Sequence, residues 1–369
     1  MAKDYNTETP LRPEQVREMI KPRAAVAPKP ITIRHHLQVA GTDEAPEAHV
    51  KVLRRGPHGG HASSLFDYDI TVEVNGVRVD QRAQPGAVEV RTFRRRELRS
   101  AQAVPTQPHD PFIPDHLTMT SFPEPIGSPR PAPARAVDPQ RRVPTTVFSP
   151  DERKVYQDTA YPWGTIGRVE SPRGVGSGVM VGPRHLLTVS HIVDWHVPSG
   201  AGWLRFTPGY FNGGQPFGQA LATQIYAYVH EDGGGINSHE QQFDFVIAVL
   251  DTRIGDACGW MGSRPYIDVW DGLPVWWHAG YPAGLTRTQR PIYQSQIALD
   301  GDNQQADEHQ AILHRGDVES GQSGGPMFAW FDAGPCAVAV QSWHNDATNG
   351  ASGGRDLDAL LTQAKADHP

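Results

Sequence analysis

Regular alternation of apolar and polar side chains marks one stretch near the start of the chain. Residues 66–74 (FDYDITVEV) follow this pattern, and residues 77–80 (VRVD) resume it after an Asn-Gly pair. Alternation with period two predicts half-buried strands, and Asn-Gly is the preferred pair for a type I′ turn between them. A two-residue turn pairs Val74 with Val77, which puts the apolar side chains of both strands on one face. The pattern therefore predicts a β-hairpin, with residues 88–90 as a candidate third strand.

Short apolar runs separated by glycine-rich turns fill the second half of the chain. Examples are the segments GSGVMVG, HLLTVSHIV, FDFVIAVLD, PVWWHAGYP and CAVAVQSW. Their lengths suit the strands of a closed or sandwiched β fold. Helical patterns are confined to residues 12–21 (RPEQVREMIK), which are too short to be stable without docking, and to residues 357–366 (LDALLTQAKA). We therefore expect an all-β fold with a C-terminal helix.

Proline dominates the stretch between these two regions. Eleven prolines lie between Pro105 and Pro144. Proline lacks a backbone N–H and restricts φ, so this density excludes helices and central strands. We interpret the stretch as an extended linker or as a strap across a domain surface. The predicted organisation is an N-terminal β-containing propeptide or regulatory domain (residues 1–104), a proline-rich linker (105–146) and a larger domain (147–369).

Composition excludes several classes of protein. The 369 residues are 38% hydrophobic and 20% charged, and no apolar stretch approaches the roughly 20 residues that a membrane span needs. The first residues, MAKDYNTETPLRPEQ, lack the apolar core of a secretory signal, which favours the cytoplasm over secretion. Cys258 and Cys336 are the two cysteines, so one disulfide is possible but none is required. Neither CxxC nor HExxH occurs, and we expect no metal site.

Charge is divided unevenly along the chain. Residues 1–150 contain 21 Lys and Arg against 17 Asp and Glu, whereas residues 151–369 contain 13 against 24. The acidic portion would repel nucleic acid and attract cationic partners or substrates, although a solvated acidic surface explains the same numbers. The basic run at residues 91–99 (RTFRRRELR) is interpreted either as a solvated edge or as a processing site.

Three segments carry residue types that act together in nucleophilic catalysis. His191 follows an apolar strand in LLTVSHIVD, Asp244 opens another in FDFVIAVLD, and Ser323 lies in the glycine-rich turn of SGQSGGPMF. A serine hydroxyl needs an imidazole to take its proton, and the imidazole needs a buried carboxylate to orient it and stabilise its charge. A tetrahedral oxyanion needs backbone N–H donors, for which Gly321 and Ser323 are the candidates. The order and context of His191, Asp244 and Ser323 predict a catalytic triad.

With these residues identified, the sequence resembles a known family. TVSHIVD, FDFVIAVLD and GQSGGPMF look like the three catalytic blocks of trypsin/chymotrypsin-like serine proteases, and more closely those of bacterial glutamyl endopeptidases, the V8-like branch. Residues 147–169 resemble the mature amino terminus of that branch, and the likeness covers about residues 147–369. The resemblance implies two six-stranded antiparallel β-barrels with the active site between them, preceded here by a smaller N-terminal β-containing segment.

Two positions depart from the family pattern. In trypsin-like enzymes with zymogen control, an aspartate before the serine pairs with the new amino terminus, whereas this chain has Gln322. Activation by that ion pair is therefore unsupported, although release of an amino terminus near Val147 would be the analogous event in the V8-like branch. The histidine with which glutamyl endopeptidases read a substrate carboxylate is replaced by Gln341, which argues against a preference for glutamate.

The resemblance implies roles for three further residues. Asp317 is similar in placement to the aspartate with which trypsin-like enzymes select Arg or Lys, although glutamyl-type enzymes can also have an aspartate there. A buried carboxylate at this position would favour a cationic substrate side chain. Ser342 and Trp343 resemble the segment that pairs with the substrate backbone as an added strand, or they form an edge strand with one packed tryptophan. Together with Gln341, they are candidates for substrate binding.

The predicted function is that of a serine endopeptidase. It would hydrolyse peptide bonds of a polypeptide substrate through an acyl-enzyme, with no cofactor, metal, nucleic acid or membrane involved. A first alternative is a catalytically silent module that binds peptides or partners on the same fold. A second is a latent enzyme, in which the N-terminal segment acts as an intramolecular inhibitor until it is cut or displaced.

Overall fold

The computed structural model divides the chain into two compact units, residues 1–31 with 87–369 and residues 32–86. The described residues are 8–19, 48–57, 66–74, 77–78, 88–94, 97–98, 109–126, 145–198, 200–230, 241–301, 311–344 and 347–369. Among these residues, none of the helices is long and apolar enough to cross a membrane. Cys258 and Cys336 are both buried and are not joined in a disulfide.

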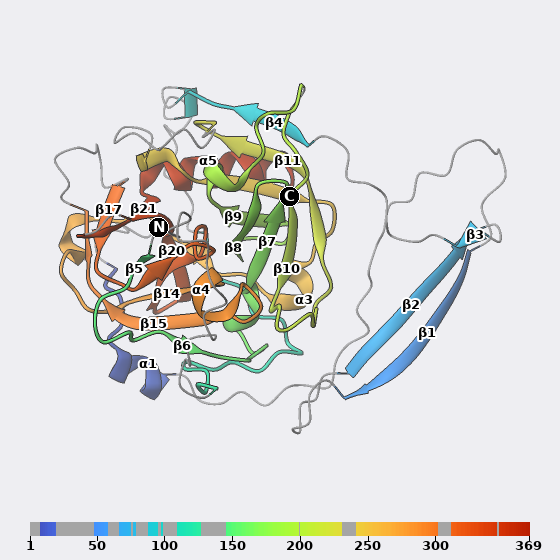
Figure 1. Cartoon of the computed structure of the whole chain (residues 1–369), viewed down its shortest axis with the longest axis horizontal. Helices are drawn as coiled ribbons and strands as arrows, with labels where there is room; N and C mark the ends of the chain where they lie inside the picture. Colours follow the sequence, from blue (N-terminus) through green and yellow to red (C-terminus); the bar gives the residue numbers. More distant parts are fainter. Residues whose placement is uncertain are drawn as a thin grey trace. The chain divides into compact units, whose positions relative to one another are not determined.

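The smaller unit is a three-stranded antiparallel sheet (Figure 1). Its strands are β1 (Ala48–Pro57), β2 (Phe66–Val74) and β3 (Val77–Arg78). Val74 lies opposite Val77, so the register predicted for the hairpin is confirmed, while the turn at residues 75–76 lies outside the described residues. The sequence pattern does not predict β1, because Arg54 and Arg55 interrupt its alternation, and the pairing with β2 shifts at the same point.

Residues 88–90 do not extend this hairpin. Instead, β4 (Glu89–Thr92) pairs in parallel with β11 (Ala220–Ala227) of the larger unit, with Val90 opposite Ile225. The prediction of a third hairpin strand is therefore wrong. Proximity in sequence favoured the hairpin. Among the described strands, however, one edge of the later half of β11 pairs with β12 and only β4 pairs with the other edge, where it uses backbone groups that would otherwise stay unpaired.

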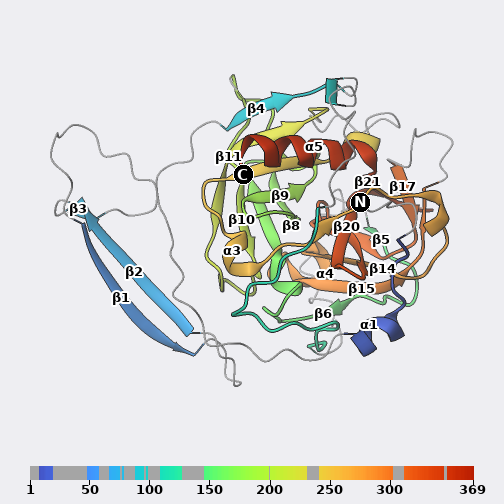
Figure 2. The same cartoon turned by 180° about the vertical axis from the view of Figure 1, so that it is seen from behind.

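Six strands of the larger unit close into a barrel (Figures 1 and 2). They are β7 (Ile166–Ser171), β8 (Gly174–Met180), β9 (His185–Thr188), β10 (Arg205–Pro208), β11 and β12 (Val246–Leu250). Neighbours are antiparallel in the order β10-β7-β8-β9-β12-β11, and β10 also pairs with the start of β11. That last pairing joins the two ends of the sheet and closes the barrel.

A second set of strands curls into the other half of this unit. The six main strands are β14 (Trp276–Gly280), β15 (Ile292–Ile297), β17 (Ala311–His314), β19 (Pro326–Phe331), β20 (Gly334–His344) and β21 (Asn349–Gly353). They are antiparallel in the order β17-β21-β20-β19-β14-β15. The short strand β16 (Leu299–Asp300) follows β15 and pairs with β17, which brings the two edges of the sheet together.

Short elements complete the larger unit. They are the strands β5 (Thr145–Thr146), β6 (Lys154–Val155), β13 (Gly262–Ser263) and β18 (Val318–Glu319), and the helices α1 (Pro13–Met19), α3 (Gly255–Cys258), α4 (Ala283–Thr286) and α5 (Arg355–Asp367). The helices predicted near both ends of the chain are α1 and α5. The predicted fold class, two antiparallel β-barrels with a C-terminal helix, is confirmed.

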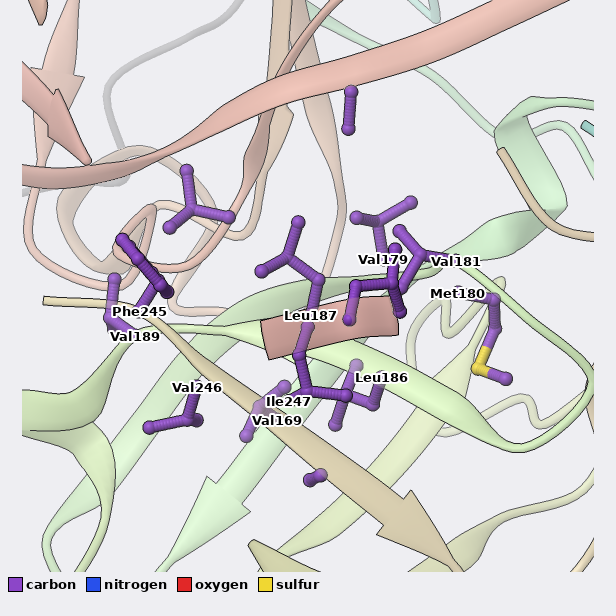
Figure 3. Close-up of a cluster of buried hydrophobic side chains, with 14 of the residues drawn as sticks. Val169, Val179, Met180, Val181, Leu186, Leu187, Val189, Phe245, Val246 and Ile247 are labelled. Atoms are coloured by element: carbon purple, nitrogen blue, oxygen red, sulfur yellow. The ribbon is translucent and has the colours of Figure 1, made fainter. Parts of the chain in front are cut away.

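Burial on both faces explains the continuous apolar runs of the first barrel. Strands β9 and β12 are buried along their whole length. Leu186, Leu187, Val179 and Ile247 belong to one cluster of fully buried side chains (Figure 3). Helix α5 packs against β9, β11 and β12, and its Leu361 is fully buried as well. Because neither face of these strands meets water, the alternation that marks a half-buried strand disappears.

Parts of the chain before residue 147 are built into the larger unit. Residues 109–126 lie along the barrels through single β-bridges, and Val16 of helix α1 is buried. The buried guanidinium of Arg264 pairs with Glu8 (2.8 Å) and with Asp110 (3.0 Å). One cation of the second barrel therefore holds two separate N-terminal segments, and losing both partners would leave a buried charge unpaired.

Four buried histidines predict that the fold weakens in acid. Burial lowers the pKa of His109 and His278 to about 3 and that of His185 and His314 to about 4, from an ordinary value of 6.5. In the unfolded chain these imidazoles take up protons as the pH falls below 6.5, whereas in the folded chain they stay neutral until about pH 4. Their contribution to stability is therefore present above pH 6.5 and is lost toward pH 4 and below.

The expected loss is on the order of 1 kcal/mol per histidine per pH unit within that range. Urea unfolding at a series of pH values from about 7.5 to about 5 measures it. The variant His196→Gln is the matched control, because the side chain of His196 is 65% exposed and its loss should leave the slope unchanged. A free energy of unfolding that stays constant over this range would contradict the prediction.

Candidate active site

Strand pairing in the first barrel brings His191 and Asp244 together. His191 lies in a short 3₁₀ helix (Ser190–Ile192) that follows β9, and Asp244 lies two residues before β12. Strands β9 and β12 are antiparallel neighbours, with Thr188 opposite Val246. The chain that leaves β9 and the chain that enters β12 therefore meet at the same end of the barrel.

The contact between them is a pair of hydrogen bonds. Nδ1 of His191 lies 2.7 Å from Oδ2 of Asp244, and the backbone N–H of His191 donates to Oδ1 at 2.9 Å. The Asp244 side chain is 1% exposed and that of His191 is 25% exposed. A buried carboxylate that accepts from Nδ1 leaves the lone pair of the neutral ring on Nε2, which is the nitrogen that a general base needs.

Ser323 lies in the tight turn between β18 and β19. Gly321 and Gly324 in this turn have φ values of +92° and +83°, which favour glycine. A Cβ at Gly324 would overlap the carbonyl oxygen of Ser177 and Oγ1 of Thr188. Gly324 is therefore required both by its backbone conformation and by the close approach of the first barrel, and Gly321 by its backbone conformation.

The turn is attached to the residues that hold His191 and Asp244. Ser177 of β8 donates its N–H to the Ser323 carbonyl at 2.8 Å. Gly324 donates its N–H to the Gln341 carbonyl at 2.8 Å, and the adjacent Ser342 donates its hydroxyl to Oδ2 of Asp244 at 2.6 Å. Both barrels thus contribute to one hydrogen-bonded cluster, which links the Ser323 turn to Asp244 through Gln341 and Ser342.

The amides predicted to bind an oxyanion lie on the same turn. Gly321 and Ser323 flank Gln322, whose side chain is fully buried. Within the described part of the chain, neither amide donates to a protein acceptor. The hydroxyl of Ser177 donates to the Gly321 carbonyl at 2.8 Å and accepts from the N–H of Tyr281 at 2.8 Å, which fixes the peptide that precedes Gln322.

The residues predicted for substrate binding lie in different surroundings. Asp317 is 1% exposed, and its oxygens accept from the N–H groups of Phe148 (2.7 Å) and Glu152 (2.9 Å). Burial raises the pKa of this carboxyl, and the two N–H donors oppose that shift. The Asp317 carboxylate is therefore held by the segment at residues 148–152.

Gln341, Ser342 and Trp343 follow one another in β20. The Gln341 side chain lies 2.7 Å from Nε2 of His314 and donates to the Trp343 carbonyl at 2.9 Å. Ser342 contacts Asp244, as described above, and Trp343 packs on Gly350 of β21. Gln341 thus binds the Ser323 turn through its backbone carbonyl, and Ser342 binds the Asp244 carboxylate through its side chain.

Sequence reasoning missed Ser177 and Arg153. Ser177 links the nucleophile turn to β8, and Arg153 donates to the side chain of Gln322 at 2.9 Å. A serine inside GSGVMVG and an arginine inside a polar segment are common residues in common settings. No local signal distinguishes them, because their contacts come from the packing of distant segments.

The two-barrel fold is of the kind found in chymotrypsin-like serine proteases. The chain matches no family model. It is 28% identical over 218 residues to a glutamyl endopeptidase from Bacillus licheniformis. This match covers 58% of the chain and 63% of that relative, so the chain spans less than two thirds of the relative's length. The resemblance to the glutamyl endopeptidase branch predicted from the sequence is confirmed.

Two proteases are among the solved structures that the chain matches in part. One is a Glu endopeptidase in complex with MPD, at 22% identity and a TM-score of 0.49, which covers 60% of this chain and 99% of its own. The other is the protease Anisep from Arthrobacter nicotinovorans, at 22% identity and a TM-score of 0.46, which covers 58% of this chain and 99% of its own.

Proposed function

We propose that the chain is a serine endopeptidase, with Ser323 as nucleophile, His191 as general base and Asp244 as the residue that orients it. The observation that carries the proposal is the 2.7 Å contact of Nδ1 of His191 with the buried carboxylate of Asp244, in a cluster that also holds the Ser323 turn. A buried aspartate, a half-buried histidine and a serine on a glycine-rich turn are the three parts that acyl transfer needs.

The proposed reaction proceeds through an acyl-enzyme. Oγ of Ser323 attacks the carbonyl carbon of the substrate while its proton passes to Nε2 of His191. The amides of Gly321 and Ser323 donate to the oxyanion, and Asp244 stays ionised and stabilises the imidazolium. His191 then gives the proton to the leaving amine as the peptide bond breaks. Water repeats the sequence on the acyl-enzyme and releases the acid product.

The proposed substrate is a polypeptide that adds a strand beside β20. Ser342 and Trp343 would offer their backbone groups to the residues before the cleaved bond. The curated relative is named as a glutamyl endopeptidase, but Gln341 of this chain is neutral and is held by His314, so it brings no fixed positive charge to a substrate carboxylate. The two N–H donors on Asp317 likewise favour a structural role for that carboxylate over pairing with a substrate cation.

A fluorophosphonate probe tests this proposal against a catalytically silent module. Such a probe phosphonylates a serine only where a base and an oxyanion site activate it. We expect the full-length protein to be labelled, and peptide mapping to find the label on Ser323. Prior heat denaturation is the control and should abolish labelling. An intact protein that stays unlabelled would favour the silent binding module.

Latency is the second alternative, and the packing of the N-terminal segments bears on it. Val16, Leu98 and Leu117 are each at most 5% exposed, and Arg264 pairs with Glu8 and Asp110. We propose that these segments remain with the barrels as part of the working enzyme. In a latent enzyme, by contrast, the uncut chain would be inactive and cutting before Val147 would release activity.

A further inference from the structure

A buried polar layer lies directly beneath the Ser323 turn. Asp317, Glu319 and Gln322 are 1%, 5% and 0% exposed. The Gln322 side chain accepts from the N–H of Glu319 at 3.1 Å and donates to the Asp317 carbonyl at 3.1 Å. Two hydrogen bonds of the Gln322 side chain therefore anchor the turn to the backbone of Asp317 and Glu319. Gln322 is the residue between the two proposed oxyanion amides.

Arg153 supplies the cation of this layer. Its residue exposure is 4%, and its Nη1 donates to Oε1 of Gln322 at 2.9 Å and lies 3.3 Å from Oε1 of Glu319. Its Nε and Nη2 donate to the two oxygens of Asp151 at 3.0 Å and 2.8 Å. Although burial lowers the pKa of Arg153, the hydrogen bond to Asp151 and the charge of Glu319 raise it, and the net shift is upward. The guanidinium therefore stays charged, and all three of its nitrogen atoms donate hydrogen bonds.

The segment that carries Arg153 is itself anchored to the turn. The N–H groups of Phe148 and Glu152 donate to the Asp317 carboxylate, and β5 pairs with β18 immediately before the turn. Without Arg153, the carboxylates of Glu319 and Asp317 would lie buried under the turn with no guanidinium to offset them. Repulsion and desolvation would then favour movement of the turn.

We infer that Arg153 is a positioning residue of the proposed reaction, an internal cation that holds Gln322 and, through it, the amides of Gly321 and Ser323. This inference rests on the proposed function. The neutral side chain of Gln322 cannot pair with a terminal ammonium as a carboxylate would, whereas it can accept from the Arg153 guanidinium. Because that donor comes from within the chain, the turn is ordered without cleavage before Val147.

The first test compares kcat and KM for three variants of the full chain. Arg153→Gln should lower kcat by roughly 10- to 100-fold, because small displacements of oxyanion donors are that costly, while KM changes by about threefold at most. Arg153→Lys keeps the charge but loses the fork, so it should recover part of kcat. Arg253→Gln removes a half-exposed pair with Asp256 and should leave kcat unchanged.

The second test asks whether Arg153 acts through Gln322. If it does, combining Arg153→Gln with Gln322→Ala should lower kcat no more than the larger single change does. A purely structural role would shift the urea midpoint but leave kcat of the folded protein unchanged. If Arg153→Gln does not fold, Arg153→Lys and Gln322→Ala still test the inference, because it requires both variants to have a lower kcat than wild type. Unchanged kcat in folded Arg153 or Gln322 variants overturns the inference.

The third test is cleavage of the whole chain at a protease recognition site inserted within residues 127–144. We expect kcat/KM before cutting to be within about twofold of the value after it. A rise of about tenfold or more on cutting would show that a new amino terminus activates the turn, and it would overturn the inference. The two proposals can fail separately. A wild-type protein that neither cleaves peptides nor reacts with the fluorophosphonate probe refutes the proposed function, and the role of Arg153 that rests on it. An active wild-type protein whose kcat does not depend on Arg153 refutes the role of Arg153 alone.

Discussion

Replacing Ser323 with alanine is expected to lower kcat by about 10⁴-fold or more, since no other group in the cluster replaces the lost nucleophile. Ser323 is half-buried and is held through its backbone carbonyl, which alanine retains. The free energy of unfolding should therefore change by no more than about 0.5 kcal/mol. Turnover of a peptide substrate and urea unfolding of both proteins measure the two quantities.

Ser263→Ala is the matched control for this change. Like Ser323, Ser263 is a serine next to glycine; it is buried, and its hydroxyl has no hydrogen-bond partner in the described residues. It lies in β13, outside the triad cluster. We expect its kcat to equal that of wild type. Equal turnover by Ser323→Ala and wild type would refute the mechanism.

Asp244→Asn is expected to have the second largest effect, a loss of about 10⁴-fold in kcat near neutral pH. An asparagine NH₂ can donate to Nδ1 of His191, so the ring proton moves to Nε2 and the base loses its lone pair. The shape of the side chain and most of its packing remain, so the protein should stay folded. Measurement of kcat against pH, together with urea unfolding, separates loss of the base from loss of the fold.

Two comparisons sharpen this test. Ser342→Ala removes one of the hydrogen bonds to Oδ2 of Asp244 but leaves His191 paired, so kcat should fall by only about tenfold. Asp251→Asn, at the other end of β12, changes an exposed aspartate and should leave kcat unchanged. If Asp244→Asn retained more than about a tenth of wild-type kcat, Asp244 would not be the residue that orients the base.

Several local elements could be predicted because they depend on near neighbours in the chain. The Asn-Gly turn and the alternation around it predict the register in which Val74 lies opposite Val77. The apolar run at residues 246–250 becomes the buried strand β12, and the helical pattern near the end becomes α5. Each of these predictions needs only the preferences of a few adjacent residues.

Long-range packing is where prediction from the sequence fails. β4 pairs with β11, more than a hundred residues away, because an uncovered strand edge is available there. Arg264 likewise reaches Glu8 and Asp110, although nothing in the sequence around it predicts either partner. Such contacts depend on which segments cover which surface, and many pairings satisfy the same local pattern.

For the candidate site, the sequence alone establishes the residue types, their order and their local settings: a histidine after a strand, an aspartate before one and a serine in a glycine turn. The tertiary structure brings His191 within 2.7 Å of Asp244 and places Ser342 against the same carboxylate. It also places Arg153 against Gln322 of the Ser323 turn, and the Asp317 carboxylate against the N–H of Glu152. The physical reason is one of range. Backbone preferences and side-chain periodicity act between neighbours, whereas hydrogen bonds and burial act on whatever the closed barrels bring within a few ångströms.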